Sequence, residues 1–76
     1  MNYWSPIRPF ALGELVTVDR HEEFFIGRSR RTVCPGDILV VTRMKEGIIT
    51  AVLRAEEELH PNHIDHPTFV RIPQDR

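Results

Sequence analysis

Residues 35–54 decide the fold, and they read PGDILVVTRMKEGIITAVLR. The stretch opens on Pro35-Gly36, a strong turn signal, and continues into residues 37–43, a run that is apolar on both faces for four positions. Such a run is typical of a central strand that is covered on two sides. Residues 44–47 predict a short connection in which Gly47 supplies a positive φ, and residues 48–54 complete a β-hairpin.

Shorter strands are predicted on both sides of this hairpin. Residues 14–19 alternate with period two, residues 23–26 form a short second strand, and residues 68–72 alternate again until Pro73 stops them. Residues 28–31 are either a loop or the exposed continuation of a ribbon that reaches Val33.

Two further segments join these strands. Residues 55–60 predict at most one helical turn before Pro61, because the run is too short for an independent helix. Residues 60–67 are polar and predict a loop.

An extended arm, residues 1–12, is predicted ahead of the first strand. Pro6 and Pro9 fix φ and favour extended geometry in the residues that precede them. The apolar residues of the arm are expected to pack across an open side of the domain; they are Tyr3, Trp4, Ile7 and Phe10.

The chain length allows a single domain. With 76 residues there is room for one core, and a chain of this size buries only about 60% of the surface that it exposes when unfolded. The hydrophobic fraction of 41% and the charged fraction of 28% are those of an ordinary globular protein. We therefore expect one domain over residues 1–76, with the arm at 1–12 and a barrel at 13–73.

The central hairpin resembles a known fold. Residues 35–41 (PGDILVV), followed by residues 46–52 (EGIITAV), are similar to the turn, strand and glycine layout of SH3-like and KOW-type small β-barrels. A strongly bent barrel also removes the exposed edges of so small a sheet. The resemblance implies an all-β fold, a small five-stranded SH3-like barrel with an extended N-terminal arm. The glycine-rich loop of the KOW motif is missing, so the resemblance implies the fold more than nucleic-acid or ribosome binding.

One set of apolar positions is expected to supply most of the core. Its members are Val16, Val18, Ile38, Val40, Ile49, Leu53, Val70 and Ile72. On this interpretation Leu53→Ala costs about 2–5 kcal/mol, which is enough to unfold a domain of this size.

The charged residues predict a basic patch in a chain whose net charge is only −1. Arg28, Arg30 and Arg31 are close together in sequence, and Arg43 and Lys45 can join them from a neighbouring strand. A guanidinium suits phosphates and carboxylates. Aromatic side chains nearby can add stacking, and the candidates are Phe24, Phe25, Tyr3 and Trp4. The patch therefore predicts a surface for nucleic acid or for an acidic protein partner. The alternative is a solvated loop whose charge is cancelled by neighbouring glutamates.

Three histidines three residues apart, His60, His63 and His66, suggest a metal site. Imidazole is a ligand for zinc and other divalent metals, and Asp65 or His21 is the candidate fourth ligand. The alternative is a polar loop whose histidines cap turns or titrate freely.

Catalysis is not predicted. Cys34 is the only cysteine, which excludes an intramolecular disulfide, and with no histidine within ten residues it is expected to be a small buried apolar residue. There is no nucleophile-elbow serine and no glycine-rich phosphate loop.

The expected function is that of a non-enzymatic binding or regulatory module that docks on a larger protein or nucleoprotein assembly. The alternatives are a nucleic-acid-binding barrel that uses the arginines, and a metal-binding protein that uses the histidines. Because no apolar run approaches the ~20 residues of a membrane span and no signal peptide is evident, we expect a cytoplasmic protein that does not engage a membrane.

Overall fold

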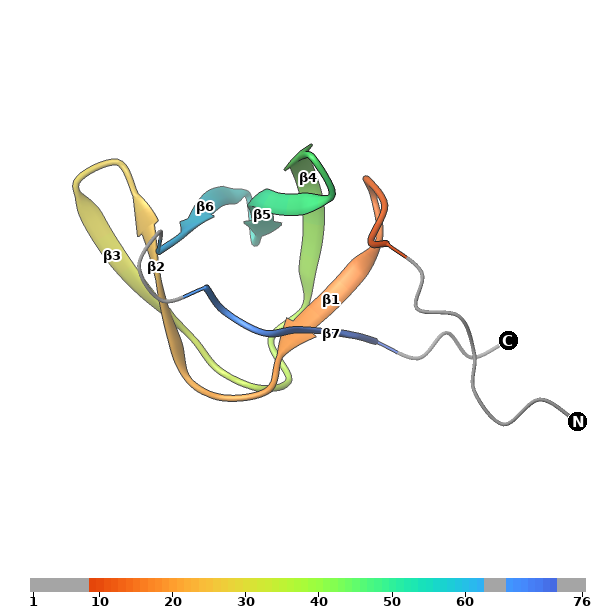
Figure 1. The fold of residues 1–76 in the computed structure, drawn as a ribbon. Helices are drawn as coiled ribbons and strands as arrows, with labels where there is room; N and C mark the ends of the chain where they lie inside the picture. Colours follow the sequence, from red (N-terminus) through yellow and green to blue (C-terminus); the bar gives the residue numbers. More distant parts are fainter. Residues whose placement is uncertain (1–8, 63–65, 73–76) are drawn as a thin grey trace, which may run out of the picture.

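The computed structural model describes residues 9–62 and 66–72 (Figure 1). These residues form one antiparallel sheet that curls into a half-barrel. Within the described ranges the chain is all-β, and no helix is long and apolar enough to cross a membrane.

The sheet has seven strands rather than the predicted five. They are β1 (Leu15–Val18), β2 (Glu22–Ile26), β3 (Ser29–Val33), β4 (Leu39–Lys45), β5 (Ile48–Arg54), β6 (Glu57–Pro61) and β7 (Phe69–Arg71). Their order in the sheet is β3-β2-β6-β5-β4-β1-β7. The first extra strand, β3, is the ribbon that was one of the two predicted alternatives for residues 28–31.

The other extra strand, β6, replaces the predicted helical turn. Arg54 pairs with Glu57, so Ala55 and Glu56 alone connect β5 to β6. Both connecting residues have positive φ, 49° and 72°, which is the pattern of a type I′ hairpin turn. The helical prediction was wrong because Ala-Glu-Glu-Glu favours a helix locally, whereas Leu59 is buried completely only when β6 joins the sheet.

The predicted Pro35-Gly36 turn is confirmed. The Asp37 amide donates to the Cys34 carbonyl at 3.0 Å, and Gly36 has a φ of +99°, as the third residue of a type II turn requires. The Gly36 amide also donates to Thr17 Oγ1 at 2.9 Å, which ties this turn to β1.

The β4–β5 hairpin is bent by two irregularities. Val41 pairs with Val52, Arg43 with Ala51 and Met44 with Ile49, so Thr42 and Thr50 each lack a directly opposed residue. Such bulges increase the local twist and bend a strand. They explain how one sheet curls far enough to enclose a core on its concave side.

The core lies inside this curl. Its buried side chains are Val16, Val18, Phe24, Val33, Leu39, Val41, Ile49, Val52 and Leu59. Of the predicted core, Val16, Val18 and Ile49 are confirmed.

Five predicted core residues lie on the opposite side of their strands. Ile38, Leu53 and Val70 are exposed, and Val40 and Ile72 are only half-buried. Their sequence neighbours, which include Leu39, Val41 and Val52, are the buried residues instead. Because β4 and β5 are apolar on both faces, period-two alternation does not tell the concave side from the convex side.

Aromatic rings pack across the open side of the half-barrel. The Phe24 ring of β2 lies edge-on to Phe69 of β7 at 6.0 Å between centroids, although these strands are not paired. Phe10 packs on Phe69 in the same manner at 6.4 Å, and the Arg71 guanidinium lies 4.5 Å from the centre of the Phe10 ring. Phe10 is the one apolar residue of the predicted arm that is described, and it packs on this side as expected; Tyr3, Trp4 and Ile7 lie outside the described residues, so the packing of the arm stays a prediction.

A matched pair of leucine truncations tests this division of the sheet. We expect Leu59→Ala to lower the free energy of unfolding by about 2–5 kcal/mol, because Leu59 is fully buried. Leu53→Ala is expected to cost well under half as much, since that side chain is 36% exposed, which corrects the larger effect predicted from the sequence. Urea unfolding followed by circular dichroism measures both, and equal costs would contradict the assignment of the two faces.

Candidate functional site

The convex side of strands β7, β1, β4 and β5 is covered by apolar side chains. We call this surface the outer apolar face and define it by six residues: Leu15, Ile38, Val40, Leu53, Val70 and Ile72. Ile38 is 60% exposed, Val70 42% and Leu53 36%, and the other three are half-buried.

Strand register brings these six residues together. Leu15 pairs with Val40, and Val40 pairs with Leu53. The Ile72 amide donates to the Leu15 carbonyl at 3.2 Å, which extends this row onto the end of β7. The row therefore crosses four strands without a charged residue.

A second row lies two residues along the same strands. Val70 pairs with Thr17, and continuing the β1–β4 register places Ile38 on the other side of Thr17. Thr17 is the only polar residue between the two apolar ends of this row, and its hydroxyl oxygen already accepts the Gly36 amide. The face is thus apolar in practice over both rows.

The convex side of β6, β2 and β3 is different in character. Arg30 Nη1 donates to Glu23 Oε1 at 3.4 Å and lies over the Phe25 ring, with 5.6 Å from Cζ to the centroid. Phe25 pairs with the exposed His60 of β6. Charged and aromatic side chains alternate here, so the apolar surface is confined to the other half of the sheet.

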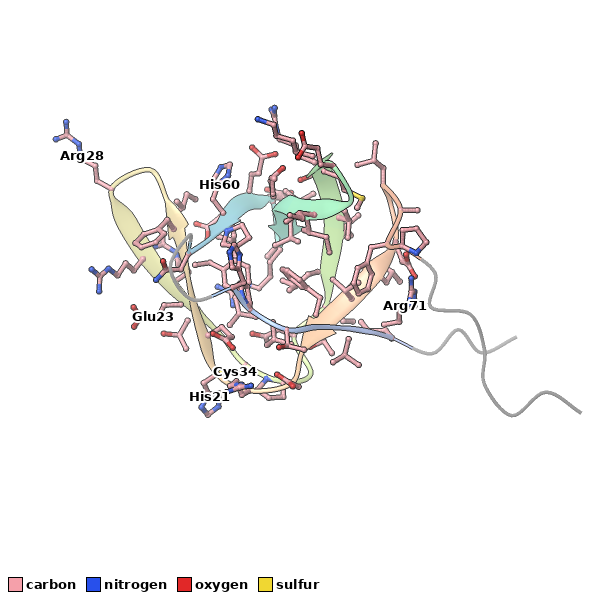
Figure 2. The ribbon with its side chains drawn as sticks, in the orientation of Figure 1. His21, Glu23, Arg28, Cys34, His60 and Arg71 are labelled. Atoms are coloured by element: carbon pink, nitrogen blue, oxygen red, sulfur yellow. The ribbon has the colours of Figure 1, made fainter. Side chains whose placement is uncertain are left out.

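The predicted basic patch is divided by the fold. Arg28 lies at the tip of the β2–β3 hairpin and points away from the sheet (Figure 2). Arg43 and Lys45 are on β4, and two strands, β6 and β5, lie between β4 and β2. The five basic residues do not form one continuous cluster.

Most of the predicted basic residues are also paired with carboxylates. Arg31 binds Glu57 through two hydrogen bonds of 3.1 and 3.3 Å, and Arg43 Nε donates to Glu58 Oε2 at 3.1 Å. Within residues 9–62 and 66–72, Arg28 and Lys45 have no hydrogen bond or ion pair. Carboxylates therefore offset the charge of Arg30, Arg31 and Arg43, although only Glu23 is one of the glutamates near them in sequence.

Two of the four predicted aromatic contributors, Phe24 and Phe25, lie among the described residues, and Tyr3 and Trp4 lie outside them. Phe24 is fully buried in the core, and Phe25 takes the outward position beside it. The aromatic side chain beside the arginines is therefore Phe25, over whose ring Arg30 lies.

Arg54 closes the end of the half-barrel where β3 meets β5. Its Nη1 donates to the Thr32 carbonyl at 3.0 Å and to Asp37 Oδ2 at 3.1 Å. Asp37 Oδ2 also accepts the Cys34 amide at 2.9 Å. Cys34 is half-buried in this turn and carries a free thiol, in partial agreement with its predicted burial.

The predicted histidine site is described only in part. His60 on β6 and His66 line the same hollow of about 220 Å³, together with Ile48, Pro61 and Asn62. His63 and Asp65 lie outside the described residues. His21 lines a second hollow, of about 320 Å³, which His66 also borders. Residues 9–62 and 66–72 contain no group of three potential metal ligands, so the three-histidine site stays a prediction.

Comparison with protein-family models, with curated proteins and with solved structures found no match. The function has to be inferred from the surface itself.

Glu58 borders the outer apolar face and is held as a carboxylate. It pairs with Leu53 across the β5–β6 hairpin, accepts from Arg43 Nε and from Thr42 Oγ1, and lies 3.9 Å from His60 Nε2. The Arg43 hydrogen bond lowers the pKa of Glu58 below its ordinary value of 4.5; desolvation opposes this shift, and the charge of Arg43 and the Thr42 hydrogen bond add to it. The bulge at Thr42 presents both donors to this one carboxylate.

The sequence reading missed the outer apolar face as a surface, although it named five of its six residues. The available signal was the run of apolar residues on both faces of residues 37–43, which predicted cover on two sides. The described chain covers the concave side of that strand only.

The pH dependence of stability tests the Glu58 network. A carboxylate whose pKa is lower in the folded than in the unfolded chain stabilises the fold. Its contribution is complete above about pH 4.5 and is lost as the pH falls through the pKa of the folded state. We expect Glu58→Gln to lower Tm modestly at pH 7, and by less and less as the pH falls through the folded pKa of Glu58, because the wild-type carboxylate then becomes protonated as well. Glu46→Gln is the control, since within the described ranges Glu46 has no ion pair or hydrogen bond. A Glu58→Gln difference that is constant with pH would contradict the assignment.

Proposed function

We propose that this chain is a non-enzymatic binding module that docks on a larger protein through the outer apolar face. The observation that carries the proposal is the register of four strands, which gathers six apolar side chains into one uncharged surface on the convex side of the sheet. The SH3-like relationship is part of this proposal, supported by the type II turn at Pro35-Gly36 and the hairpin that follows it.

The size of the face fits the centre of a protein interface. Six side chains, at about 4.8 Å between strands and about 7 Å along each strand, cover roughly 200 Å². Exposed apolar patches of a few hundred Å² are commonly functional in small monomers. Because a stable interface buries about 800 Å² on each partner, this face would form an apolar centre within a wider polar rim.

The pairing of the arginines favours a protein over nucleic acid as the partner. Proteins bind a phosphate backbone mainly through lysine and arginine side chains, which displace the counterions of the nucleic acid. Arg30, Arg31 and Arg43 each have a carboxylate partner, and the net charge is −1. Apolar docking needs neither free cations nor low salt.

The test compares charged substitutions on the two convex surfaces. We expect Leu53→Asp and Ile38→Asp to abolish retention of the native partner by the immobilised chain, because each places an unpaired charge in the centre of the interface. Circular dichroism should show a folded chain for both variants. The melting temperature of Ile38→Asp should stay close to wild type, since that side chain is 60% exposed, whereas Leu53→Asp is expected to lower it, since Leu53 is 36% exposed.

Thr32→Asp is the matched control, because it adds the same charge to the exposed β3 on the other half of the sheet. It should retain the same proteins as wild type, with nuclease present and at high salt. If Leu53→Asp and Ile38→Asp retain the same proteins as wild type, the outer apolar face is not the docking surface. Loss of the bound material on nuclease treatment would instead support the nucleic-acid alternative.

A further inference from the structure

One end of the outer apolar face is bordered by two glutamates. Leu53 pairs with Glu58, and the Ala55-Glu56 turn joins their two strands. Glu58 is the cross-strand partner of Leu53 and so shares the convex side with it, and Glu56 lies in the turn at the end of this hairpin, three residues after Leu53. Arg54 and Glu57 face the other way, where they bind Asp37 and Arg31.

The two glutamates differ in whether a basic side chain already pairs with them. Glu58 forms an ion pair with Arg43 and lies 3.9 Å from His60 Nε2. Glu56 is exposed, and within the described part of the chain it has no hydrogen bond or ion pair. The Glu56 carboxylate is therefore the unneutralised charge in the turn that follows Leu53.

We propose that the outer apolar face binds a protein segment whose apolar side chains are followed by an arginine or lysine that pairs with Glu56. This inference rests on the proposed function and deepens it by giving the chemistry of the partner. Charge complementarity at the rim of an apolar interface sets register and partner choice. A segment with an acidic flank would meet Glu56 as a like charge and would be rejected.

A second copy of this chain fits the face less well. The two basic side chains without a partner among the described residues are Arg28 and Lys45. Arg28 is at the β2–β3 hairpin tip, and Lys45 is at the end of β4 opposite to Ile38. Neither borders the apolar rows, so a copy docked face to face would leave Glu56 without a cation.

The experiment uses three synthetic peptides that share one apolar stripe and differ only in the flanking residue, which is arginine, glutamine or glutamate. Each is titrated into the isotope-labelled full chain, and the shifts of backbone amides give both the affinity and the site. We expect the arginine peptide to bind about two- to five-fold more tightly than the glutamine peptide at low salt, the range of an exposed ion pair. The glutamate peptide should bind most weakly, and the differences should shrink at about 0.5 M salt.

Variants of the chain then assign the preference to one carboxylate. Glu56→Gln should remove the preference for the arginine peptide, and Glu56→Lys should reverse that preference. Glu46→Gln, which neutralises an exposed glutamate at the tip of the β4–β5 hairpin, should leave the preference intact. A preference that survives Glu56→Lys would overturn the inference, as would a dimer in sedimentation equilibrium that Leu53→Asp dissociates.

The two proposals fail in distinguishable ways. If none of the peptides shifts the amides of β1, β4 and β5, and Leu53→Asp still retains the native partner, the docking face itself is wrong. If Leu53→Asp abolishes binding of every peptide but Glu56→Lys leaves their ranking unchanged, only the rim inference is wrong.

Discussion

The pairing of Val41 with Val52 is the constraint on which the rest of the structure depends. Both side chains are buried, and they sit where the β4–β5 hairpin begins to bend. Because successive strand residues point to opposite sides, burying this pair places Val40 and Leu53 on the convex side. The two bulges beyond it curl the sheet, and that curl allows Phe24, Leu39 and Leu59 to share one core.

The cost of this arrangement is an apolar surface that the described chain does not cover. A small barrel has only one interior, so a hairpin that is apolar on both faces must leave one of them outside. Charged residues pair with one another between strands and turns, as Arg54 does with Asp37 and Arg43 with Glu58. The division of the convex surface into an apolar half and a charged half is the basis of the docking role that we propose.

Much of the secondary structure was predictable from residue pattern. The Pro35-Gly36 turn and the central hairpin follow from local chemistry, because Gly36 and Gly47 supply positive φ. The β6 strand was not predictable, since Ala55 and Glu56 occupy a left-handed conformation that their side chains disfavour and only tertiary pairing maintains.

The side of the sheet that faces the core was not predictable either: Ile38 and Leu39 are equally apolar, and their difference in burial is set by long-range packing. The charge network was hidden for the same reason, because Arg31 and Glu57 are 26 residues apart.

The most direct test of the account measures which side of the hairpin solvent reaches. Single cysteines replace one residue at a time in a Cys34→Ser background. The positions are two adjacent pairs: Ile38 and Leu39 at the start of β4, and Val52 and Leu53 on β5. The rate at which each cysteine reacts with a thiol reagent is measured in the folded chain. The account predicts that I38C and L53C react at rates near those of the unfolded chain, while L39C and V52C are protected by the stability of the fold. Fast labelling of L39C and V52C with protection of I38C and L53C would contradict it.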